Sequence, residues 1–222
     1  MKNILTSNKN EFYFVLALLL ISILFWNTYL IYPIKMFSVL IHETFHGFGA
    51  LISGGKINSV NIDFNLGGKI ETEFGNEFLI AISGYFGSLL IGILFFIYSR
   101  NNNWLKYLSY LISIIIVIVI SNSNPSFEFI SISLIVIFFL IFLSIFNTNF
   151  YIQLFARFFG LVSMFYVLID LKNDLFDEFY VSDSKILANI IDVNSSLIGL
   201  IWLIISFLLI YFSIKKNYFK NY

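Results

Sequence analysis

Long apolar stretches, separated by short polar connections, constrain the fold of this chain more than any other feature of its sequence. About seven of them have roughly the length that an α-helix needs to cross a bilayer. They cover residues 12–32, 35–53, 77–98, 104–121, 127–147, 151–171 and 196–214. The second contains several polar residues and the fourth is short, so six spans are the alternative. We predict an all-α polytopic membrane protein with about six to seven transmembrane helices.

The composition excludes several other classes of protein. Hydrophobic residues make up 59% of the 222 residues and charged residues 12%, whereas a soluble domain is roughly half apolar and a quarter charged. The formal net charge of zero gives no basic surface for a nucleic-acid partner. No polar stretch is long enough to fold in water. We therefore expect residues 1–222 to form a single membrane-embedded domain, multi-pass in the cell membrane, with the lipid bilayer as its solvent; its oligomeric state stays open.

The beginning of the chain has the charge order of a signal sequence, with Lys2 and Lys9 ahead of the apolar residues 12–32. An apolar run of about 20 residues is longer than the core of a cleaved signal, so we expect a retained first helix. Seven spans would place the start of the chain on the same side of the membrane as residues 54–77, and the second and sixth helices would run in the same direction. Lys and Arg are then equally numerous on both sides, which gives no orientation.

The connection after the second stretch has a pattern of its own. Residues 56–64 alternate apolar and polar side chains, Gly67 and Gly68 interrupt the pattern, and residues 69–74 alternate again. Alternation with a period of two is typical of a strand with one buried face. We predict a short β-hairpin at about 56–74, after the second helix.

The second stretch contains the sequence His42-Glu43-Thr44-Phe45-His46. Two histidines four residues apart lie on the same face of a helix, so both can bind one Zn²⁺. Glu43 lies roughly 100° further around the helix, where its carboxylate can take a proton from a zinc-activated water without being a ligand. The motif helix at about 35–53 therefore predicts metal-assisted amide hydrolysis, with one Zn²⁺ per chain held by His42 and His46 and with Glu43 as the catalytic base.

The alternative for these residues is a pair of histidines hydrogen-bonded between helices, with Glu43 paired to a lysine. Three ionisable groups on one turn of a membrane helix cost a few kcal/mol each unless a metal or a polar cavity compensates them. The chain has two histidines and no cysteine, which excludes a thiolate ligand and a Ser-His-Asp triad independent of this motif. Metal binding is therefore the favoured interpretation.

A catalytic zinc normally has three protein ligands and one open position, so a carboxylate must supply the third ligand here. The region for this ligand is about 165–185. Asp170, at the end of the sixth stretch, would lie in the same half of the membrane as the histidines and is the predicted ligand. Asp174, four residues later on the same helix face, is the alternative third ligand. Asp183 is expected to cap the helix that follows it.

These motifs together resemble the site-2 protease class of membrane zinc metallopeptidases. The resemblance rests on the helix-embedded His-Glu-x-x-His, the Gly-Gly and hairpin after it, and the segment Ser83-Gly84-Tyr85-Phe86-Gly87-Ser88 in the next span. It is closer to a compact bacterial and plant-type subfamily without a PDZ domain, whose late Asp-x-x-x-Asp-Leu and Ser-Asp motifs match Asp170, Asp174-Leu175 and Ser182-Asp183. The Asn-Pro-Asp-Gly or Leu-Asp-Gly motif of better-studied members is missing. The resemblance covers about residues 38–190 and implies membrane-protein substrates. The hairpin would extend an unwound substrate by strand addition, or would serve as a simple lid or spacer.

The predicted function is that of a membrane-embedded zinc endopeptidase that hydrolyses peptide bonds in transmembrane or membrane-proximal segments of other proteins. A membrane transporter is one alternative, because buried ionisable groups also form ion paths. A membrane protein that binds metal without catalysis is another. Transport needs charges along a whole path, but the predicted spans contain almost no acidic residue outside 42–46. This distribution favours the peptidase.

Overall fold

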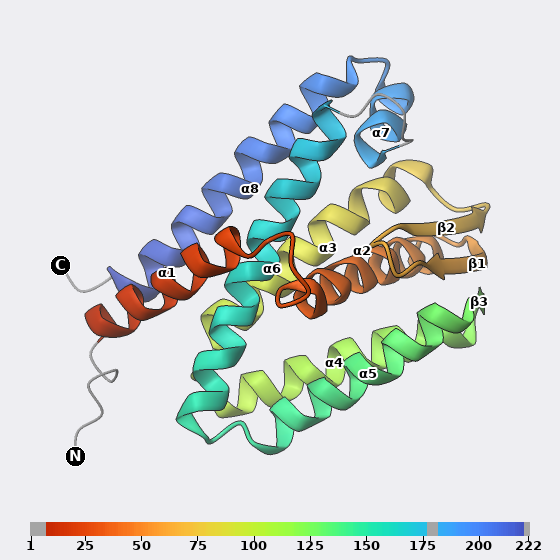
Figure 1. Ribbon diagram of the computed structural model, residues 1–222. Helices are drawn as coiled ribbons and strands as arrows, with labels where there is room; N and C mark the ends of the chain where they lie inside the picture. The colour runs from red at the N-terminus through yellow and green to blue at the C-terminus, as the bar shows by residue number, and fades with distance from the viewer. Residues whose placement is uncertain (1–7, 177–181, 220–222) are drawn as a thin grey trace.

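Helices make up most of the computed structural model, which describes residues 8–176 and 182–219 (Figure 1). In these ranges the helices are α1 (Asn8–Leu24), α2 (Tyr32–Ile52), α3 (Glu77–Tyr98), α4 (Asn102–Ser121), α5 (Phe127–Ile145), α6 (Phe150–Phe176), α7 (Asp183–Ile191) and α8 (Ser195–Tyr218). The strands are β1 (Lys56–Ile62), β2 (Gly68–Glu73) and β3 (Asn124–Pro125). The predicted helical fold with a short hairpin after the second helix is confirmed.

Five helices are long and apolar enough to cross a membrane: α3, α4, α5, α6 and α8. α2 carries the polar motif and packs against both α3 and α6. This arrangement agrees approximately with the predicted six to seven spans, and it is that of an integral membrane protein. The short helix α7, between α6 and α8, is the helix that was expected to follow Asp183.

The first helix departs from the prediction in its length and in its placement. α1 ends at Leu24, and turns follow it. In one of these turns, the hydroxyl of Thr28 donates to the carbonyl of Phe25 at 2.7 Å. At the other end of α1, the ring of Phe12 contacts the rings of Tyr218 and Phe219 after α8. The start of α1 therefore lies beside the end of α8 and away from the hairpin (Figure 1). The expectation that the start of the chain and the hairpin share one side of the membrane stays a prediction, although the structure places the start of α1 and the hairpin at opposite ends of the bundle (Figure 1).

A buried ion cluster holds this end of the bundle together. Arg157 of α6 donates to the carboxylate of Glu11 in α1 at 2.6 Å and to the hydroxyl of Ser99 at 2.9 Å. Glu11 also pairs with Arg100 and accepts a hydrogen bond from the hydroxyl of Tyr218 at 3.1 Å. Buried charges are tolerated when they are paired and hydrogen-bonded, so this cluster fixes α1 to α6 and α8.

The hairpin belongs to a three-stranded sheet in the order β2-β1-β3. β1 pairs antiparallel with β2, with Val60 opposite Ile70, and β3 adds two residues in parallel. A register shift between Ile57 and Ser59 brings Ile57, Val60 and Ile62 to one buried face. β2 is therefore an edge strand, and its outer side is free of backbone partners in the sheet.

Packing of the motif helix against α6 positions the site. The rings of Phe37 in α2 and Phe159 in α6 lie 4.6 Å apart. Later in the same two helices, His42 and Asp170 line a common cavity. Both pairs have the same order along the chain, so α2 and α6 run in the same direction, as the sequence predicted.

Candidate metal centre and catalytic residues

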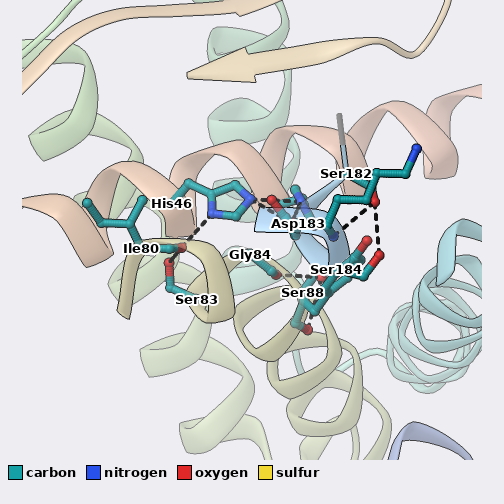
Figure 2. Close-up of polar contacts among 11 residues, drawn as sticks. His46, Ile80, Ser83, Gly84, Ser88, Ser182, Asp183 and Ser184 are labelled. Carbon is teal, nitrogen blue, oxygen red and sulfur yellow. Dashed lines mark hydrogen bonds and ion pairs between the residues drawn. The ribbon is translucent and has the colours of Figure 1, made fainter. Parts of the chain in front are cut away.

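α2 presents His42 and His46 on one face, as their four-residue spacing requires. Their Nε2 atoms lie 2.9 Å apart, and the two side chains expose only 15% and 6% of their surface. The Nδ1 atom of His46 lies 2.7 Å from the backbone carbonyl of Ile80 in α3 (Figure 2). Because a carbonyl only accepts, Nδ1 carries the proton and the lone pair on Nε2 is free to bind a metal.

The carboxylate that meets both histidines belongs to Asp183, the first residue of α7. Its Oδ2 atom lies 2.9 Å from Nε2 of His42 and 3.0 Å from Nε2 of His46. In the described part of the chain, these three residues form a group whose possible ligand atoms all lie within 4.8 Å of one another. Burial alone would raise the pKa of Asp183, but the two imidazoles beside it hold the pKa of this carboxyl well below its usual range.

Ser182 caps α7, so the predicted capping role of Asp183 is wrong. The hydroxyl of Ser182 accepts a hydrogen bond from the backbone N–H of Lys185 at 3.4 Å and lies 2.9 Å from the hydroxyl of Ser184. The backbone of Ser182 is extended, which is usual for an N-cap residue. Because Ser182 satisfies the helix end, the carboxylate of Asp183 is free to face the histidines (Figure 2).

The structure describes only one of the two carboxylates that the sequence predicted as third ligand. Asp170 of α6 lines the cavity that contains His42 and His46, but it does not belong to the group of converging ligand atoms. The side chain of Asp174 lies outside the described residues. Asp170 as ligand, with Asp174 as its alternative, therefore stays a prediction. Local spacing could not predict that Asp183 meets His46, because the two residues are 137 positions apart. The feature of the sequence that pointed to Asp183 was the Ser-Asp pair of the family resemblance.

Glu43 is buried, and the backbone of a glycine lies close to it. A Cβ added to Gly68 at the start of β2 would lie 2.3 Å from Oε1 of Glu43. A second glycine lies close to the histidines, because a Cβ added to Gly84 of α3 would lie 2.3 Å from Nε2 of His46. Both distances are far below normal contact, so only glycine fits at these two positions without a shift. The edge strand thus begins directly beside the predicted catalytic base.

A cavity of about 540 Å³ connects these groups. Its walls come from α2, β2, the first turns of α3, the C-terminal part of α6, and α7. Val39, Ile80, Tyr85 and Tyr166 supply apolar surface next to the histidines and carboxylates. Ligand pockets typically enclose roughly 300–1,000 Å³ and combine apolar walls with a few convergent polar groups. The cavity therefore has the size and the lining of a ligand pocket.

The apolar helices and the convergent His-His-Asp group define a helical membrane protein with a possible metal site. A family model described as Peptidase M50B-like matches residues 15–213. The chain belongs to this family, which is a site-2 protease family, as the resemblance implied. Membership supports membrane metallopeptidase activity in general, and the family is typically metal-dependent. Comparisons with curated proteins and with solved structures find no match.

Proposed function

We propose that this protein is a zinc-dependent endopeptidase of the cell membrane that hydrolyses peptide bonds in transmembrane or membrane-proximal segments of other proteins. The observation that carries the proposal is the convergence of two imidazole nitrogens and one carboxylate oxygen beside Glu43. Membership in a peptidase family supports the same conclusion.

The donor atoms fit a zinc ion. Imidazole nitrogen and carboxylate oxygen are usual zinc ligands, and tetrahedral ligands at 2.0–2.1 Å from zinc lie about 3.3 Å from one another. The three donor atoms here are separated by 2.9, 2.9 and 3.0 Å. A small outward movement would give tetrahedral spacing. In this proposal, His42, His46 and Asp183 hold one zinc per chain and leave the fourth position open.

Zinc bound there supplies a Lewis acid, which polarises the scissile carbonyl and makes a water molecule nucleophilic near neutral pH. Glu43 accepts a proton from that water while the water oxygen attacks the carbonyl carbon. Glu43 then delivers the proton to the amine nitrogen as the C–N bond breaks, so the products are a carboxylic acid and an amine, and the acid's proton passes to the amine to leave a carboxylate and an ammonium group. The carbonyl of Ile80 keeps His46 in the tautomer that leaves Nε2 available.

The free edge of β2 supports binding of the substrate as a strand. A helical segment must unwind before its peptide bonds become accessible, and unwound backbone groups inside a membrane need hydrogen-bond partners. β2 lines the cavity at Gly68, Lys69, Ile70 and Thr72, and no strand among the described residues neighbours its outer side. Strand addition at this edge would provide those partners and hold the chain across the metal site.

The placement of charge favours a peptidase over a transporter. Among the described residues, one group of buried ionisable side chains surrounds the cavity and another surrounds Glu11 and Arg157 at the opposite end. Between them lies an apolar core that includes the aromatic side chains of Phe37, Phe95 and Phe159. Ion transport needs polar groups along its whole path. The core separates the two groups.

The decisive experiment compares wild-type protein with Glu43→Gln in detergent, using a quenched fluorescent peptide with an apolar segment as probe. Glutamine keeps the shape of the side chain but accepts no proton near neutral pH, so the rate should fall by about 100-fold or more. Zinc, measured by elemental analysis, should stay near one per chain in Glu43→Gln and be lost in a His42→Ala/His46→Ala variant.

Glu128→Gln is the matched control, because Glu128 lies in the first turn of α5 and does not line the cavity. It should cleave at the wild-type rate. Wild-type activity in Glu43→Gln would refute the proposed base, and unchanged zinc in the double histidine variant would refute the metal site.

A further inference from the structure

The hairpin forms the wall of the cavity that a substrate strand would contact. Leu66, Gly68, Ile70 and Thr72 line this wall, and the backbone of Gly68 lies directly against Glu43. A shift of the hairpin would therefore move the edge strand relative to the catalytic base. What holds the tip of the hairpin in place then matters for binding.

The turn at the tip, residues 63–67, is closed by its own hydrogen bonds. The backbone N–H of Asp63 donates to the carbonyl of Gly67 at 2.9 Å. The Asp63 carboxylate accepts from the N–H groups of Asn65 at 2.6 Å and Gly67 at 3.1 Å. The side chain of Phe64 is 60% exposed, so it adds little anchoring. These bonds fix the shape of the turn but not its position relative to the helices.

Tyr32 joins this turn to the motif helix. Its hydroxyl donates to the backbone carbonyl of Phe64 at 2.6 Å. This hydrogen bond connects the turn to a helix. Tyr32 is the first residue of α2, and α2 also carries Glu43. At the root of the hairpin, Gly55 donates to the carbonyl of Ala50 in the same helix at 2.8 Å. One helix therefore holds both ends of the hairpin and presents the catalytic base between them.

We propose that Tyr32 is a positioning residue whose hydroxyl keeps the edge strand at the distance from Glu43 at which a substrate strand can bind. The inference rests on the proposed peptidase function. Loss of the hydroxyl lowers the fraction of protein in which β2 is in place, and the apparent affinity for substrate falls by that fraction. A bound substrate strand pairs with β2 and restores its position, so turnover of the bound substrate is nearly unchanged.

The test compares Tyr32→Phe with Tyr29→Phe, whose tyrosine is 93% exposed and lies three residues earlier in the chain. Tyr32→Phe should raise KM for the fluorescent peptide about 3- to 10-fold, as expected for one hydrogen bond, and change kcat by less than about twofold. Zinc content should stay the same. Tyr29→Phe should match the wild type in all three quantities.

A second readout follows the tip without catalysis. The chain has no cysteine, so a nitroxide at Asn65→Cys reports the mobility of the turn alone. Its mobile spectral component should grow in the Tyr32→Phe background and not in the Tyr29→Phe background. An unchanged spectrum, or a fall in kcat at constant KM, would overturn the inference. If the wild type cleaves no peptide, the peptidase proposal is refuted. A more mobile label in Tyr32→Phe would then still show that the Tyr32 hydrogen bond holds the turn.

Discussion

Replacement of Asp183 by asparagine tests the assignment of the third ligand. The carboxylate of Asp183 lies 2.9 and 3.0 Å from the two Nε2 atoms, whereas Asp170 only lines the cavity. Protein zinc sites with four ligands bind with about 10–16 kcal/mol, or roughly 3 kcal/mol per ligand. Loss of one ligand should therefore weaken binding on the order of 100-fold. A group that orients a ligand without touching the metal has a smaller effect, and we expect about tenfold for Asp170→Asn.

Competition with a chromophoric chelator measures the zinc dissociation constants of both variants. Asp192→Asn is the control, because Asp192 is exposed at the other end of α7, and asparagine tolerates its left-handed backbone with φ of 54°. Its zinc affinity should equal that of the wild type. If Asp170→Asn loses zinc while Asp183→Asn keeps it, the ligand is Asp170, as the sequence predicted. The carboxylate of Asp183 would then lie away from the histidines when the metal is bound.

Two other predictions follow from the packing. Gly84→Ala should weaken zinc binding at least about tenfold, because its Cβ would lie 2.3 Å from Nε2 of His46; Phe86→Ala, at an exposed position two residues later, should bind zinc normally. Since the chain lacks cysteine, single cysteines report sidedness with a membrane-impermeant thiol reagent. Asn10→Cys and Lys216→Cys should react from one side and Glu73→Cys from the other; reaction of Asn10→Cys and Glu73→Cys from the same side would restore the seven-span arrangement.

The local parts of the site could be predicted because short-range geometry determines them. The four-residue spacing of His42 and His46 places both on one face of α2, and their Nε2 atoms lie 2.9 Å apart. The alternation of residues 56–74 with its Gly-Gly break corresponds to β1 and β2, within a residue at the outer ends. In both cases, the periodicity of the backbone converts sequence spacing directly into a shared face.

The parts that were missed depend on contacts between distant segments. Asp183 reaches the histidines only because α7 packs against α3 and α8, and no spacing within 165–185 distinguishes its carboxylate from that of Asp170. The first apolar run is long enough for a full span, yet α1 stops at Leu24, turns follow it, and Glu11 at its start pairs with Arg157 of α6. Apolar length alone does not show where a helix begins relative to its neighbours.

The two charged regions of the bundle differ in how their carboxylates are balanced. At the end near the chain termini, Glu11 lies between Arg100 and Arg157, so its negative charge is balanced by protein groups.

At the cavity, the carboxylates of Glu43, Asp170 and Asp183 lie in the same lining as the two imidazoles, and the lysine in the lining, Lys69, is 70% exposed and paired with Glu71 at 2.6 Å. Among the described residues, the cavity lining therefore has more carboxylates than positively charged side chains available to pair with them. A divalent ion on His42, His46 and Asp183 would balance them, and because these ligands come from α2 and α7, the same ion would fasten α7 over the cavity.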